Sequence, residues 1–138
     1  MIQIIAGEKG KGKTKILLDK VNADIAEAKG SIVYLDKSNK NMYELNNKIR
    51  LINVRDYCVE SSKEFIGFVC GIISQDHDLE KIYLDSFLKI ACADEELATV
   101  LEKIEMISHK FQIDFVISVS ADPKTLPEIA QKYMIVAL

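Results

Sequence analysis

Short apolar runs alternate along the chain with segments whose apolar residues recur at helical spacing. Residues 2–6 and 31–36 (SIVYLD) have the length of strands, and the second run is apolar on both faces, as in buried parallel strands. Between them, residues 13–28 predict a helix whose buried side would carry Leu17, Leu18, Val21 and Ile25. We expect Gly30 to end this helix as its C′ residue.

The alternation continues after a polar stretch, residues 37–48, for which the pattern predicts no element. Residues 50–54 predict a short third strand, and residues 81–87 (KIYLDSF) contain a strand that ends at Asp85. Residues 115–120 (FVISVS) predict another buried strand, and residues 133–138 (YMIVAL) a last one.

Capping signals predict where three further helices begin. Ser61 and Glu64 have the spacing of a capping box, and so do Thr125 and Glu128, while Asp94 is expected to cap the helix between them. The expected buried residues of the first of these helices are Phe65, Val69, Ile72 and Ile73, and those of the second are Leu97, Leu101, Ile104 and either Met106 or Ile107.

This order of elements is typical of an α/β protein. Strands that alternate with helices of this length predict a mainly parallel sheet of about five to six strands, with right-handed crossovers and helices on both faces. No repeat, low-complexity linker or change of composition divides the chain, so we expect residues 1–138 to form one domain.

Residues 7–14 (GEKGKGKT) stand between the first strand and the first helix and match the phosphate-loop pattern G-x-x-x-x-G-K-[ST]. Glycines allow the main chain to curl so that its N–H groups point at phosphate oxygens, and the helix that follows adds its free amides and its dipole. Lys13 would reach the terminal phosphates and Thr14 would bind Mg²⁺. The alternative is a flexible glycine turn whose lysines are merely solvated.

Additional lysines surround this motif and raise its positive charge, although each of them is equally compatible with a solvated role. The residues predicted to bind the nucleotide are Gly7, Glu8, Lys9, Gly10, Lys11, Gly12, Lys13, Thr14 and Lys15.

A second group for the metal is predicted at Asp85, which follows the apolar run Ile82 to Leu84. Ligands of parallel sheets bind beyond the carboxyl ends of the strands, so this carboxylate should face the loop and bind Mg²⁺ directly or through water, with Thr14. Asp36 ends the preceding long strand in the same way. The alternative for both is an ordinary aspartate in a turn.

Taken in order, GEKGKGKT, the strand ending at Asp36, KIYLDSF and FVISVSAD resemble the RecA-type branch of P-loop NTPases. The chain also resembles small bacterial ATP-binding proteins and, more loosely, PilT-type ATPases. The resemblance implies a three-layer P-loop NTPase fold with strand order 5-1-4-3-2, in which residues 115–120 lie between the loop strand and the Asp85 strand. It also implies that Ser118 or Ser120 senses the terminal phosphate.

One departure from this family concerns catalysis. RecA-type enzymes resemble one another in keeping a glutamate near the end of the second strand, where it orients the attacking water, whereas this chain has Asp36. Because a general base must come within hydrogen-bonding reach, the shorter side chain predicts hydrolysis that is slow or depends on a partner. Lys13 and Asp36 are the catalytic candidates.

Composition and charge limit the kinds of binding partner and the kinds of reaction that the sequence suggests. A net charge of −3 argues against a general nucleic-acid binder. No apolar run reaches the roughly 18 residues of a membrane span, and three cysteines without a C-x-x-C pair suit a reducing cytoplasm. With only two arginines, Arg50 and Arg55, a small-metabolite kinase with an arginine clamp is the weakest alternative.

Two functions remain open from the sequence. The first is Mg²⁺-dependent ATP binding with modest hydrolysis, and the second is a nucleotide sensor that binds ATP without turnover. A homo-oligomer or an unidentified protein partner is compatible with either.

Overall fold

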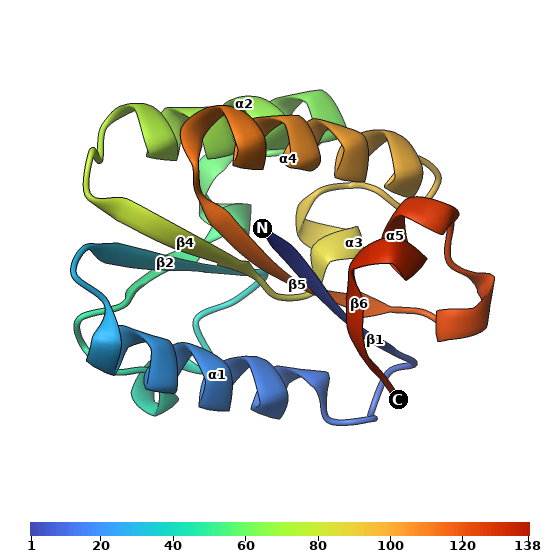
Figure 1. Ribbon diagram of the computed structural model, residues 1–138, viewed down its shortest axis with the longest axis horizontal. Coiled ribbons are helices and arrows are strands. Elements are labelled where there is room, and N and C mark those ends of the chain that lie inside the picture. The colour runs from blue at the N-terminus through green and yellow to red at the C-terminus, as the bar shows by residue number, and fades with distance from the viewer.

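The computed structural model describes residues 1–138 and contains one six-stranded sheet in which every pair of neighbouring strands is parallel (Figure 1). The order across the sheet is β3-β2-β4-β5-β1-β6. The strands are β1 (Ile2–Gly7), β2 (Ser31–Asp36), β3 (Arg50–Asn53), β4 (Leu79–Leu84), β5 (Asp114–Ser120) and β6 (Met134–Ala137). The α/β fold class predicted from the sequence is therefore confirmed.

Helices cover both faces of this sheet. Figure 1 shows α1 on one face and α2 and α4 side by side on the other. The helices are α1 (Lys13–Glu27), α2 (Ser62–Ser74), α3 (Phe87–Ile90), α4 (Leu97–Phe111) and α5 (Glu128–Tyr133). Short 3₁₀ segments at Met42–Glu44, Val54–Tyr57 and Pro123–Thr125 complete the connections.

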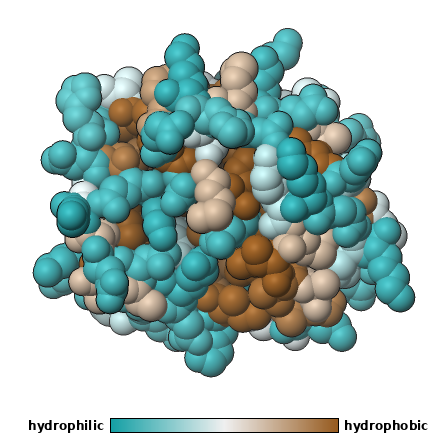
Figure 2. All heavy atoms as spheres, in the orientation of Figure 1, coloured by the Kyte–Doolittle hydropathy of each residue, from teal (hydrophilic) through white to brown (hydrophobic).

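The sheet separates two apolar layers. A cluster of 27 buried residues fills the side of α2 and α4, and a cluster of 10 fills the side of α1. Burial of apolar side chains on both faces explains why the strands read as continuous apolar runs. On the face seen in Figure 2, hydrophilic residues alternate with apolar residues that show in several places, most widely in the lower half.

The strand order extends the predicted one. The order 5-1-4-3-2 counted five strands, whereas residues 50–53 form the additional strand β3 at the edge beside β2. The other five strands follow the predicted arrangement, with β5 between β1 and β4.

Helix ends were predicted less well than helices. The Ser61 side chain accepts from the Glu64 amide at 3.2 Å, so the first capping box is confirmed. Asp94 caps nothing, because α4 begins after Glu96 and α3 precedes it. Thr125 does not cap α5 either, since its hydroxyl donates to the Asp122 carbonyl.

The prediction that Gly30 is the C′ residue of the first helix was also wrong. Helix α1 ends in extended backbone at Ala28, and Gly30 does not adopt the left-handed conformation of a C′ glycine. Instead, a Cβ at Gly30 would lie 1.9 Å from the Asp78 carbonyl oxygen. Glycine is needed here because the chains entering β2 and β4 approach closely.

Other predictions about exposure have clear outcomes. Of the two candidates on α4, Ile107 is buried and Met106 is 55% exposed. None of the helices has both the length and the apolar character that crossing a membrane requires.

We predict that Gly30→Ala lowers the free energy of unfolding by about 1–3 kcal/mol, because the added methyl group forces the main chain at Asp78 to move. Gly67→Ala is the matched control. Gly67 lies within α2, and a Cβ added there would meet no atom within 4 Å. Alanine at this position should therefore raise the free energy of unfolding by about 0.5–1 kcal/mol. Urea denaturation of both variants measures the difference, and equal effects would contradict the close approach.

Candidate functional site

The segment between β1 and α1 forms an open loop of main-chain amides. Gly10 and Gly12 have φ values of +86° and +91°, which favour glycine, and a Cβ at either would meet nothing within 4 Å. The amides of residues 8–12 donate no hydrogen bond within the chain, and Gly12 begins α1 without a side-chain cap. Unpaired donors at a helix N-terminus, on glycines with free space, fit the polyphosphate chain of a nucleotide.

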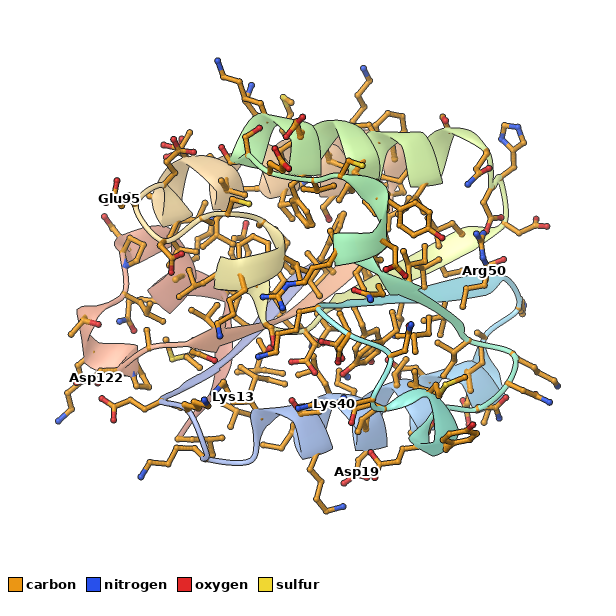
Figure 3. The ribbon with its side chains drawn as sticks, turned by 180° about the vertical axis from the view of Figure 1, so that it is seen from behind. Lys13, Asp19, Lys40, Arg50, Glu95 and Asp122 are labelled. Carbon is orange, nitrogen blue, oxygen red and sulfur yellow. The ribbon has the colours of Figure 1, made fainter.

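Lys13 lies within this loop, where the loop meets α1 (Figure 3). Its ammonium group donates to the Glu8 carbonyl at 3.0 Å, and the residue is only 7% exposed. Burial lowers the pKa of this lysine, and the charge of Asp85 opposes that shift. No carboxylate forms an ion pair with it. Lys13 is thus a sheltered cation that an anion in the loop would stabilise.

Asp85 follows β4 directly and is the most heavily hydrogen-bonded side chain of the site. Its Oδ2 accepts from the hydroxyls of Thr14 (3.0 Å) and Tyr34 (2.8 Å). Its Oδ1 accepts from the Ser118 hydroxyl (2.7 Å) and the Ser86 amide (2.9 Å). The carboxylate is 2% exposed. The structure therefore brings together Thr14 and Asp85, the two residues predicted to hold the metal.

Sequence reasoning missed Tyr34. It stands between the apolar residues Val33 and Leu35 of β2, and only its hydroxyl distinguishes it from a core residue. Its ring stacks on Tyr83 with centroids 6.0 Å apart, and the Tyr83 hydroxyl donates to Asp24 of α1. Burial raises the pKa of Tyr34, and the charge of Asp85 raises it further. Tyr34 consequently stays a hydrogen-bond donor to Asp85 at physiological pH.

Ser118, one of the two serines that the resemblance implied as phosphate sensors, contacts Asp85. Its hydroxyl donates to Asp85 and accepts from the Ser86 amide at 2.9 Å, so it orients the carboxylate. Ser120, at the end of β5, is exposed.

Asp36 is a second buried carboxylate at the same edge of the sheet. β2 and β4 are neighbours, and the amide of Asp85 donates to the Leu35 carbonyl at 2.9 Å. Asp36 is 2% exposed and accepts from the Lys37 amide (2.7 Å) and the Asn41 side chain (3.3 Å). Burial raises its pKa, as does the negative charge of Asp85. Two buried carboxylates whose charges repel each other favour a cation nearby.

The donor set suits Mg²⁺ better than a metal held by protein alone. No three His, Cys, Asp or Glu side chains lie close enough to hold a metal ion. Mg²⁺ usually takes one or two protein oxygens and completes its shell with phosphate oxygens and water. Thr14 and Asp85 could provide the protein oxygens.

The remaining loop residues take varied positions. The Lys15 ammonium pairs with Asp19 at 3.1 Å, and Figure 3 shows Asp19 on the outer side of α1, so Lys15 points away from the sheet. Glu8, Lys9 and Lys11 are exposed. Gly7 is buried against the last residue of the chain, and a Cβ on Gly7 would lie 2.8 Å from that of Leu138.

Comparisons with known proteins support the fold. The chain matches no family model and no curated protein sequence. Among solved structures it is similar to the crystal structure of flagellar accessory protein FlaH from Methanocaldococcus jannaschii, with a TM-score of 0.60 and 16% sequence identity. The match covers 95% of this chain and 65% of FlaH, so the chain spans just under two thirds of that protein's length. A likeness at this identity establishes the shared fold.

We predict that Asp36→Asn raises stability at neutral pH and flattens its pH dependence. The ordinary pKa of the carboxyl group is 3.8, and the pKa of Asp36 in the folded protein is higher. At pH values between the unfolded and the folded pKa, the folded state therefore binds more protons than the unfolded state. Stability should therefore fall as pH rises through this window, and asparagine removes that loss.

Urea denaturation at several values from about pH 4 to about pH 8 measures this dependence. The control is Asp19→Asn on the exposed side of α1, which should leave the slope unchanged. A slope that is the same in wild type and Asp36→Asn would contradict a pKa of Asp36 that burial and the charge of Asp85 raise.

Proposed function

We propose that the chain binds a nucleoside triphosphate, with ATP as the expected ligand, together with Mg²⁺ at the loop of residues 7–14. The contact between the Thr14 hydroxyl and the Asp85 carboxylate, 3.0 Å apart, is the observation that carries the proposal. These residues are 71 positions apart in sequence, and the sequence pattern assigned both of them to the same metal.

Each part of the loop has a defined task in this proposal. The free amides of residues 8–12 would donate to phosphate oxygens, and Lys13 would exchange its contact with the Glu8 carbonyl for a contact with the terminal phosphates. Bound Mg²⁺ would neutralise phosphate charge. Tyr34, Ser86 and Ser118 would hold the Asp85 carboxylate in the orientation that presents it to Thr14.

We further propose that hydrolysis is slow or depends on a partner. Asp36 is the available carboxylate for orienting water, and its raised pKa brings it closer to the range of a general base. However, both of its oxygens already accept hydrogen bonds and the side chain is almost fully buried. Water would need a rearrangement of residues 37–41 to reach it.

The same observation favours a second candidate, a nucleotide sensor without turnover. If Asp36 stays bound to Asn41 when nucleotide is present, the chain would hold ATP and signal through its surface.

The first test of the proposal is Lys13→Ala. We expect it to weaken binding of Mg-ATP at least about tenfold, because a charge-assisted hydrogen bond is lost, and to leave the fold intact. Lys29→Ala is the control. Lys29 is an exposed lysine just before β2, so it lies near the amino ends of the strands, away from the loop. Isothermal titration calorimetry measures the affinities, and circular dichroism checks folding. Equal affinity in wild type and Lys13→Ala would remove the assignment of the loop.

Phosphate release separates the two candidates. If the chain is an ATPase, wild type should release phosphate above the background of Lys13→Ala, and Asp36→Ala should lower that rate while Mg-ATP affinity changes little. Tight binding without release in wild type identifies the sensor. ATP consumption that requires an added acceptor would identify a kinase instead.

A further inference from the structure

A small pocket lined by lysines lies beside the phosphate loop, and two of these lysines, Lys37 and Lys89, have no role in the proposed nucleotide site. Its volume is about 120 Å³. Its polar lining consists of Lys9, Lys37, Ser86, Lys89, Asp94 and Ser120.

Four separate parts of the chain build this pocket at the carboxyl edge of the sheet. Lys9 comes from the loop, Lys37 from the end of β2, and Ser120 from the end of β5. Ser86, Lys89 and Asp94 come from α3 and its flanks. Lys9 is shared with the loop, whereas none of the residues 10–14 lines the pocket and neither does Asp85, so the pocket adjoins the loop amides of residues 8–12.

The lysines of the pocket are not neutralised by the protein. The ion pairs of the structure involve other cations, namely the N-terminus, Lys15, Lys81 and Lys132. Asp94 provides a single negative charge among three positive side chains. Burial lowers the pKa of Lys37, and the charges of the neighbouring Lys89, Lys40 and Arg55 lower it further. The fold thus holds several cations close together at a cost in stability.

We propose that this pocket is a second phosphate-binding site beside the loop, which binds a phosphate group through its own lysines and serines. A phosphate group carries a charge close to −2 at neutral pH and accepts several hydrogen bonds. Lys37 and Lys89 offer ammonium donors, and Ser86 and Ser120 offer hydroxyl groups. About 10–15 Å³ of accessible volume is enough for one water molecule, so the pocket has room for a tetrahedral oxyanion.

The phosphate has two sources that share this chemistry. It is either the terminal phosphate of a nucleotide in the loop or the phosphate of a second molecule beside that nucleotide. Binding of inorganic phosphate by the pocket requires no nucleotide in the loop, whereas the assignment to a terminal phosphate rests on the proposed function.

The test uses the double variant Lys37→Ala/Lys89→Ala. Both side chains lie at the surface of the site, and removing two mutually repelling charges should not destabilise the fold. The charge-matched control is Lys29→Ala/Lys110→Ala, which removes two exposed lysines that precede β2 and β5 at the opposite edge of the sheet. Lys13→Ala serves as a third protein that lacks only the loop lysine.

Inorganic phosphate is titrated calorimetrically into each protein at constant ionic strength. We expect Lys13→Ala and the charge-matched control to bind phosphate at this pocket as wild type does, and Lys37→Ala/Lys89→Ala to bind it at least about tenfold more weakly. Equal binding by the double variant and its control, or no binding by wild type in the low millimolar range, would overturn the proposal.

Repeating the titration with nucleotide identifies the source. If phosphate still binds to protein filled with a non-hydrolysable Mg-ATP analogue, the pocket serves a second molecule. If the analogue excludes phosphate, and the double variant binds the analogue more weakly but Mg-ADP equally well, the pocket serves the terminal phosphate. Nucleotide affinities that are the same in both variants, together with phosphate binding that the double variant retains, would again count against the pocket.

Discussion

The candidate site depends on one buried carboxylate and the four donors that surround it. Asp85 is removed from water, which is costly for a charged group unless its oxygens are hydrogen-bonded, and its donors come from α1, β2, β5 and the turn after β4. Each donor lies on a different element, so the carboxylate reaches this environment only when the sheet order and the position of α1 are both correct. The site and the fold are therefore specified by the same contacts.

Charge is distributed in two zones at the carboxyl edge of the sheet. Asp36 and Asp85 form a buried acidic zone, while Lys9, Lys37 and Lys89 form a more exposed basic zone beside it. Neither zone is neutralised within itself, as the direction of the pKa shifts of Asp36 and Lys37 indicates. An Mg²⁺-phosphate unit carries both signs of charge, so it is the kind of ligand that would relieve both zones together.

The sequence predicted those features that depend on local pattern. The apolar runs located the strands, and the spacing of glycines and lysines located the loop. The position of Asp85 directly after an apolar run identified it as a site residue. Features that depend on tertiary packing were missed. The residues around Gly30 in sequence do not indicate that the main chain at Asp78 approaches it. The sequence of β2 predicts Tyr34 as a core residue, and only the structure shows its contact with Asp85. The helix start predicted at Asp94 was wrong because α4 begins only at Leu97, after Glu96. The helix start predicted at Thr125 was wrong because Thr125 belongs to a 3₁₀ turn.

The stacked pair of Tyr34 and Tyr83 has a practical consequence. The chain contains no tryptophan and five tyrosines, so tyrosines dominate its near-ultraviolet absorption and its emission. One ring of the pair is hydrogen-bonded to Asp85 and the other to Asp24 of α1. A change at Asp85 or at Asp24 alters the surroundings of the tyrosine bonded to it, and this tyrosine stacks on the other tyrosine of the pair. A ligand bound at Asp85 would therefore change the surroundings of Tyr34, and tyrosine absorption and emission would follow occupancy of the candidate site without a label.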